Sequence, residues 1–183
     1  ALVVVSSTAG VEVGTEKMFH EAVTRADPVL FVVSMMDKEN ANFDAIYQQI
    51  KQRLTSKVIP VEVPIGNGPE FRGIMNLFAK CAYIYKPGTK SGEYEEVDIP
   101  ADAQDTYNHY HQELIEAISA TDDALLERYL EGVEIGRDEA IAGMKEAMKR
   151  GDLFPLFVVS SEKTFGISAL LTEIVQLMPS AYE

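Results

Sequence analysis

The sequence has no tryptophan, a single cysteine and no long apolar run. One cysteine excludes a disulfide framework and is typical of a reducing compartment. No stretch approaches the roughly 18 apolar residues that a membrane-spanning helix needs, and no basic leader with a small-residue cleavage site opens the chain. We therefore expect a cytoplasmic protein that neither spans a membrane nor is secreted.

Basic residues are also scarce, because 16 Lys and Arg oppose 29 Asp and Glu, for a formal net charge of −13. Such a surface repels phosphate backbones, which argues against sequence-independent binding to nucleic acid. We also expect no direct sequence-specific binding of nucleic acid by this segment. A basic protein partner suits this charge better. The acidity is uneven, since residues 102–139 contain eleven acidic side chains and only two basic ones, Arg128 and Arg137.

The 183 residues suffice for a sizeable core, since a chain of this size buries roughly 70% of its unfolded surface. Apolar stretches at residues 1–6, 29–33 and 155–160 are typical of strands buried on both faces of a parallel sheet. The first stretch begins at Ala1 with no methionine before it. We therefore expect the chain to be part of a longer protein.

Helical periodicity separates and follows these strands. Residues 14–25 predict a helix between the first two, which is the pattern of a right-handed parallel crossover. Residues 43–54 predict an amphipathic helix, and another runs from Ile167 to a stop at Pro179. Together these elements predict an α/β body made of residues 1–55 and 152–183.

The middle of the chain, residues 56–151, has a different texture. Its short alternating runs predict an antiparallel set of strands. Three helices follow, each opened by an aspartate suited to capping free N–H groups. The predicted strands are 58–63, 71–77, 81–85 and 94–99, with a loop at 87–92, and the helices are 102–119, 123–130 and 138–149. The fold class is therefore α/β, a partial parallel sheet of three strands with an inserted α+β subdomain.

Polar residues follow the second and the last apolar strand. Asp37 follows the second, and Ser160, Ser161 and Glu162 follow the last. Ligands of parallel sheets bind at the carboxyl ends of the strands. An aspartate there can accept two parallel N–H bonds from the edge of a guanine. The alternatives are that Asp37 caps the next helix and that the serines only form a turn.

Five segments in order, over nearly the whole length, resemble the latter part of the nucleotide-binding domain of elongation factor G, the ribosomal translocase, including the insertion of that family. The segments are VVVSSTAGVEVGTEK at 3–17, MMDKENANFDAIYQQIKQRL at 35–54, VIPVEVPIGNGPEFRGIMNL at 58–77, YEEVDIPAD at 94–102 and VVSSEKTFGISALL at 158–171. The resemblance implies a P-loop NTPase-type sheet.

The resemblance also implies a guanine site. Residues 34–37 take the place of the family's Asn-Lys-x-Asp motif, and residues 160–161 that of its Ser-Ala motif. The implied guanine-binding residues are Ser34, Met35, Asp37, Ser160, Ser161 and Glu162. Ser34 stands where the motif has asparagine, and Met35 stands where it has lysine. Losing one or two charge-assisted bonds, at roughly 1.5 to 3 kcal/mol each, would weaken nucleotide binding by one or more orders of magnitude.

The phosphate-binding motif Gly-x-x-x-x-Gly-Lys-Ser/Thr and the switch motif Asp-x-x-Gly do not occur in these 183 residues. In the family these parts hold the phosphates and Mg²⁺. GTP or GDP with Mg²⁺ is therefore expected only in the intact longer protein, which the resemblance implies is a GTPase. The chain by itself is expected to bind none of them, to hydrolyse no GTP and to contain no catalytic residue.

The acidic helices admit two interpretations. The resemblance implies that the insertion faces a ribosomal stalk protein, with partner-binding residues Asp105, Glu113, Glu116, Asp122, Asp123 and Glu127. The alternative is an ordinary solvated face. A second functional hypothesis combines these ideas: a relative impaired in nucleotide use whose acidic insertion works as a protein-binding module on the ribosome.

The remaining candidates predict structure and assembly. His109 and His111 are two residues apart and point to different helix faces, so we expect no metal site. Cys81, Tyr107, Tyr110 and Leu114 are expected in the core. The uncharged edge of residues 1–6 predicts self-association through that strand.

Overall fold

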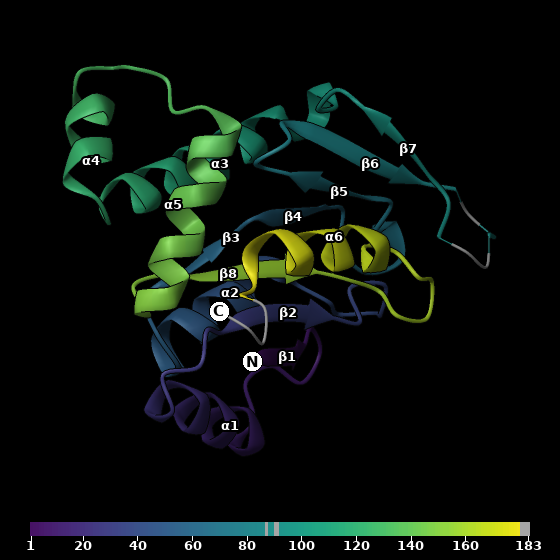
Figure 1. The fold of residues 1–183 in the computed structure, drawn as a ribbon. Helices are drawn as coiled ribbons and strands as arrows, with labels where there is room; N and C mark the ends of the chain where they lie inside the picture. Colours follow the sequence, from purple (N-terminus) through teal and green to yellow (C-terminus); the bar gives the residue numbers. More distant parts are fainter. Residues whose placement is uncertain (87, 90–91, 180–183) are drawn as a thin grey trace.

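The computed structural model describes residues 1–86, 88–89 and 92–179 and contains two sheets flanked by helices (Figure 1). Part of the predicted loop at 87–92 lies outside the described residues. In chain order the elements are β1 (Leu2–Ser6), α1 (Val13–Thr24), β2 (Leu30–Ser34), α2 (Phe43–Arg53), β3 (Val58–Pro60), β4 (Glu62–Ile65), η1 (Gly68–Glu70), β5 (Gly73–Asn76), β6 (Cys81–Tyr85), β7 (Tyr94–Val97), η2 (Ala101–Ala103), α3 (Gln104–Ser119), α4 (Asp123–Leu130), α5 (Arg137–Arg150), β8 (Phe154–Val158) and α6 (Ile167–Leu177).

The first sheet is parallel, with the strand order β1-β2-β8-β3. This confirms the α/β class. The sheet has four strands rather than three, because the apolar run at 58–63 is divided between two sheets. Its first part, β3, pairs with β8, and the amide of Val61 still donates to the carbonyl of Leu156 at 2.9 Å before β4 joins the other sheet.

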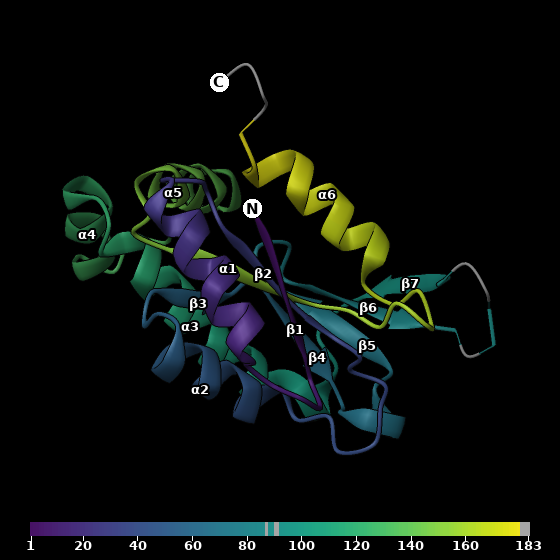
Figure 2. The same cartoon turned by 90° about the horizontal axis from the view of Figure 1, so that it is seen from below.

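Helices cover both faces of the parallel sheet. Figure 2 shows α1 and α2 on one side of it and α6 on the other. Phe19 of α1 packs on Phe31 of β2 and Phe154 of β8, with ring centroids 5.3 and 5.6 Å apart. Such aromatic packing buries much apolar area. This packing holds α1 against the sheet, in the predicted crossover that joins β1 to β2.

The strand β1 lies at the edge of the parallel sheet. Val3 and Val5 are buried, whereas Leu2 and Val4 are 51% and 52% exposed. The prediction that this strand is buried on both faces was therefore wrong. Leu2 and Val4 are exposed because the described elements leave one face of β1 uncovered, whereas β2 and β8 have neighbours on both faces.

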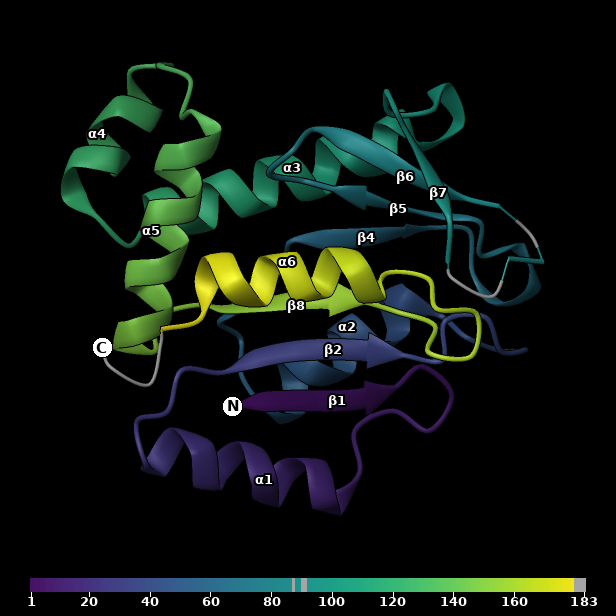
Figure 3. The same ribbon diagram turned by 45° about the vertical axis from the view of Figure 1, so that its right-hand side comes forward.

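The second sheet is antiparallel, with the strand order β4-β5-β6-β7 (Figure 3). Beside this sheet, α3 packs on α2. The ring centroid of Tyr110 lies 5.8 Å from that of Phe43 and 6.0 Å from that of Tyr47. The buried residues of both sheets form one continuous core. It includes Tyr107, Tyr110 and Leu114, which confirms their predicted core position, and Cys81 is also buried.

None of the three aspartates predicted to open these helices is the N-cap in the structure, although an aspartate one residue earlier caps α4. Helix α4 is capped by Asp122, whose Oδ1 accepts from the amides of Ala124 and Leu125 at 3.0 Å. Helix α3 instead continues from η2, where Asp102 pairs with Arg72 at 2.5 Å, and Gly136 is the N-cap of α5. An aspartate caps a helix only when its backbone is extended at the helix start.

Among the described residues, no helix combines the length and the apolarity that crossing a membrane requires.

Candidate functional site at the carboxyl ends of the parallel strands

The carboxyl ends of β1, β2 and β8 meet at one edge of the parallel sheet (Figure 3). Two hydrogen bonds join the loops that follow them. The Ser7 hydroxyl donates to the carbonyl of Met35 at 2.7 Å, and the amide of Met36 donates to the carbonyl of Val159 at 3.3 Å. The structure therefore brings together the polar residues that sequence analysis selected from separate parts of the chain.

Asp37 is the buried carboxylate of this edge. Its side chain is 5% exposed, and its Oδ1 has no hydrogen-bond partner among the residues that the structure describes. Buried carboxylate oxygens are nearly always hydrogen-bonded, because desolvation without a partner is unfavourable. The alternative that Asp37 caps the next helix is wrong, since α2 starts at Phe43 with Asn42 as its N-cap. Asp37 can thus accept donors from a ligand.

Ser34 and Met35 connect β2 to this loop. Ser34 pairs with Ser6 in the parallel register. Met35 has a φ of 63°, which is uncommon for a residue with a side chain and is concentrated at binding sites. The Met35 side chain is exposed, and its sulfur accepts a weak bond from the Ser6 hydroxyl at 3.6 Å. An apolar side chain is therefore held at the surface beside Asp37.

The last loop is organised by Ser160, which is fully buried. Its amide donates to the carbonyl of Phe165 at 2.9 Å, and its hydroxyl accepts from the amide of Lys163 at 3.2 Å. Ser161 and Glu162 lie at the exposed tip between these bonds. Ser160 thus shapes the loop, whereas Ser161 and Glu162 face outward.

Lys38 links the two loops, and sequence reasoning missed it. Its ammonium donates to the Glu162 carboxylate and lies 3.9 Å from Oδ2 of Asp37. The hydrogen bond to Glu162 and the charge of that carboxylate raise the pKa of Lys38. The only sequence signal was a cation directly after Asp37. Its partner, 124 residues away in the chain, is set by the tertiary structure.

The predicted acidic surface is divided. Five of its six residues are exposed: Asp105, Glu116, Asp122, Asp123 and Glu127. Glu113 instead joins α3 to α2, accepting from the Tyr47 hydroxyl at 2.7 Å and from Lys51 Nζ at 3.0 Å. Burial and the bond to Glu113 raise the pKa of Tyr47, which keeps this phenol protonated. Glu113 therefore has a structural role within the chain.

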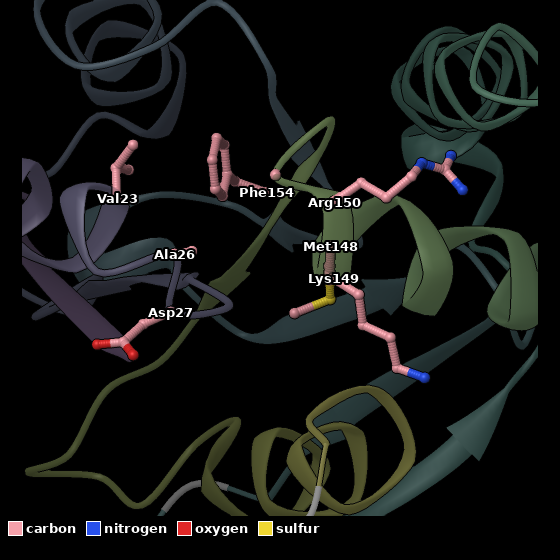
Figure 4. A pocket seen from close by; sticks show the side chains of 8 residues that line it. Val23, Ala26, Asp27, Met148, Lys149, Arg150 and Phe154 are labelled. Atoms are coloured by element: carbon pink, nitrogen blue, oxygen red, sulfur yellow. The ribbon is translucent and has the colours of Figure 1, made fainter. Parts of the chain in front are cut away.

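A pocket of about 150 Å³ lies at the opposite, amino edge of the sheet. Figure 4 shows Val23, Asp27 and Phe154 on one side and Met148, Lys149 and Arg150 of α5 on the other. Phe154 is the first residue of β8. This pocket is thus separated from Asp37 by the length of the strands.

Comparisons with known proteins agree on one family. Residues 1–180 match the family described as elongation factor Tu GTP binding domain. The elongation factor G-like protein of Thermotoga maritima is 36% identical over 168 residues, which are 92% of this chain and 23% of that protein. A crystal structure of a protein from Thermus thermophilus superposes with a TM-score of 0.86 at 33% identity, over 98% of this chain and 26% of that one.

The chain thus spans about a quarter of the length of these relatives. It belongs to the elongation factor Tu GTP binding domain family, and it is similar to part of a protein of the elongation factor G type.

Proposed function

We propose that this chain is the guanine-recognition half of a GTP-binding domain in a protein that promotes ribosomal translocation. The observation that carries the proposal is the buried Oδ1 of Asp37, which lacks a hydrogen-bond partner within the described part of the chain. A guanine edge offers two parallel N–H donors to one carboxylate. Adenine offers no such pair, so the same contact supplies base specificity.

The neighbouring residues complete the proposed pocket. The Met35 thioether is polarizable and covers a flat base face, as the apolar stem of a lysine does. Ser160 shapes the loop that presents Ser161 and Glu162 to the base. Ser34 makes fewer bonds than an asparagine, so we expect guanine nucleotide to bind more weakly than to a site with Asn and Lys at positions 34 and 35.

GTP or GDP with Mg²⁺ would bind to the longer protein, because the phosphate-binding and switch motifs do not occur in these residues. We propose that GTP hydrolysis needs the phosphate-binding and switch motifs and that residues 1–183 alone are inactive. We further propose the cytoplasm as its location and the ribosome as the site of action.

The acidic residues belong to a proposed inserted subdomain, residues 56–151, between the two parts of the α/β body, 1–55 and 152–183. In the structure the first strand of this range, β3, pairs with the parallel sheet. Asp105, Glu116, Asp122, Asp123 and Glu127 are exposed and present negative charge to a basic partner. A ribosomal stalk protein is the partner that we propose. A second candidate function follows if nucleotide does not bind: a protein-binding module that acts through this surface alone.

Titration of fluorescent GDP against the longer protein tests the nucleotide role. The decisive variant is the double substitution Ser34→Asn with Met35→Lys. We expect measurable GDP binding by the natural protein and at least about tenfold tighter binding by the variant, since each restored charge-assisted bond contributes about 1.5 to 3 kcal/mol. Met18→Lys, at an exposed methionine of α1, is the matched control and should leave GDP affinity unchanged.

Absence of binding by both proteins at millimolar GDP would contradict the nucleotide role. In that case the second candidate predicts salt-sensitive binding of a basic stalk protein, because screening weakens contacts between exposed charges. Binding that is undetectable, or equal at low and high salt, would contradict the acidic surface as well.

A further inference from the structure

Two carboxyl groups lie buried away from the guanine loops, where α6 crosses the antiparallel sheet. Glu62 of β4 is completely buried, and both of its carboxylate oxygens lack a hydrogen-bond partner in the described ranges. Glu173 of α6 is 3% exposed, and its Oε2 also lacks a partner there. Buried carboxyl groups without an ion pair are costly to ionise.

The strand register brings these two groups to one place. Glu62 stands directly opposite Asn76 in the antiparallel pair of β4 and β5. Residues in this relation project to the same face, with Cβ atoms about 5 Å apart. The Asn76 amide donates to Oε1 of Glu173 at 3.0 Å. Asn76 is therefore the common neighbour of both carboxyl groups.

Their surroundings favour the neutral acid. Burial raises the pKa of Glu62 well above its ordinary value, and the charge of Glu173 raises it further. The nearby amide of Val158 lowers this pKa, although neither Glu62 oxygen accepts a hydrogen bond from it. Burial also raises the pKa of Glu173, which the Asn76 bond and Arg137 of α5 oppose. Tyr83 and Tyr85 of β6 also face Glu62, and burial raises the pKa of both phenols, so neither carries a charge at neutral pH.

We propose that Glu62 and Glu173 form a proton-dependent joint, which fastens α6 to the inserted antiparallel sheet while at least one of the two carboxyl groups is protonated. A neutral carboxyl group lets the second group and Asn76 stay paired in a dry interface. Loss of the proton places two like charges side by side without solvent, so α6 should loosen from β4 and β5.

The joint supports more than the helix. Helix α6 starts directly after the loop of Ser160–Phe165, and the amide of Gly166 donates to the Tyr85 hydroxyl at 2.8 Å. Helix α6 is thus tied to the inserted sheet near its start, through Tyr85, and further along, through Asn76. Loss of the contact through Asn76 should therefore also loosen the loop that follows β8.

The sign of the pH dependence follows from the direction of the shift. A carboxyl group whose pKa is raised by folding stabilises the native state fully below its ordinary pKa. This contribution is lost as pH rises through the raised pKa. The native state should therefore release protons on unfolding at pH values above the ordinary pKa of a carboxyl group, and the chain should become less stable toward alkaline pH.

Equilibrium urea unfolding of the chain between pH 5 and pH 9 tests the joint. Each extra proton held by the native state raises the unfolding constant about tenfold per pH unit. The logarithm of the unfolding constant should rise less steeply with pH in Glu62→Gln, by about one unit per pH unit, because this variant has one titrating carboxyl group fewer. At pH 9 the variant should therefore be more stable than the natural chain. Glu131→Gln, at an exposed glutamate beside α4, is the matched control and should run parallel to the natural chain.

Hydrogen exchange of the α6 amides supplies the local readout. Corrected for intrinsic rates, it should accelerate between pH 6 and pH 9 in the natural chain and not in Glu62→Gln. Glu173→Gln, which keeps an oxygen for Asn76, gives an independent second variant. If both variants follow the natural pH profile of unfolding and of α6 exchange, the proposal is wrong.

Discussion

The carboxylate of Asp37 carries the chemistry of the site at the residue scale. Its Oδ1 is buried without a hydrogen-bond partner within the described part of the chain, and its Oδ2 lies 3.9 Å from Lys38 Nζ. An exposed aspartate would gain little from a ligand, because water already satisfies it. A buried oxygen gains a full charge-assisted bond when the base supplies the missing N–H.

Substitution of Asp37 by Asn should change the preferred base from guanine to xanthine. The amide keeps one acceptor and places a donor opposite C2, so it matches the carbonyl of xanthine instead of the amino group of guanine. We expect Asp37→Asn in the longer protein to weaken GDP binding by about 10- to 100-fold, the loss of about 1.5 to 3 kcal/mol, and to favour xanthosine diphosphate.

Competition of both nucleotides against fluorescent GDP and its xanthosine analogue would measure this exchange. Asp105→Asn, at an exposed position of α3, serves as the control and should leave both affinities unchanged. Equal loss of both nucleotides in Asp37→Asn would mean that Asp37 supports the loop without reading the base.

At the scale of the element, the first turn of α2 is capped by two asparagine side chains. Asn42 Oδ1 accepts from the amide of Ala45 at 2.9 Å, and Asn67 Oδ1 accepts from the amide of Phe43 at 3.1 Å. Two side chains thus satisfy N–H groups that every helix start leaves free. Asn67 comes from the segment after β4, so the second cap also ties α2 to the inserted part.

Removal of the local cap should cost stability. Asn42→Ala is expected to lower the free energy of unfolding by about 1 kcal/mol, since alanine cannot accept from the Ala45 amide. Asn108→Ala is the matched control, because Asn108 lies on the exposed face of α3 and alanine favours a helix interior. Urea unfolding at one pH compares the two, and equal effects would contradict the capping role.

The exposed edge of the parallel sheet governs assembly at the scale of the whole molecule. The strand β1 is paired only with β2 among the described elements, and Leu2 and Val4 are half exposed beside that edge. An apolar, uncharged edge strand favours pairing with a second chain. We propose that residues 1–183 associate with themselves through β1.

A charge on this face should oppose the association. Val4→Lys is expected to weaken it by about 1 kcal/mol or more, roughly fivefold, because a half-exposed valine loses its remaining apolar contact and a lysine resists pairing. Sedimentation equilibrium over a range of concentrations measures the effect. Val133→Lys, at an exposed valine after α4, is the control, and a chain that is monomeric at every concentration would contradict the proposal.

Much of the fold could be predicted because its elements have strong local patterns. Apolar runs fixed β2 and β8, and helical periodicity fixed α1 and α2 to within a residue or so. Where local patterns compete, prediction was weaker. The run at 58–63 satisfies the pattern of a strand throughout, and only the partners β8 and β5 decide that it forms two.

The site divides in the same way. A single aspartate after an apolar strand marked Asp37, because residue type and strand end suffice for that expectation. Lys38 had no visible partner in the sequence, and Glu62 and Glu173 carried no signal as a pair, since they are 111 residues apart and their nearness depends on the strand register. Sequence reasoning cannot anticipate contacts that depend on how two sheets and a helix pack.

The sequence by itself determined the class of fold, the acidic character of residues 102–139 and the residue types available to read a base, because these depend on composition and local periodicity. The tertiary structure alone decided which carboxyl groups lose contact with water. Asp37, Glu62 and Glu173 are three among 29 acidic residues. Distant elements bury their carboxyl groups, so these oxygens lack the water that satisfies an exposed carboxylate.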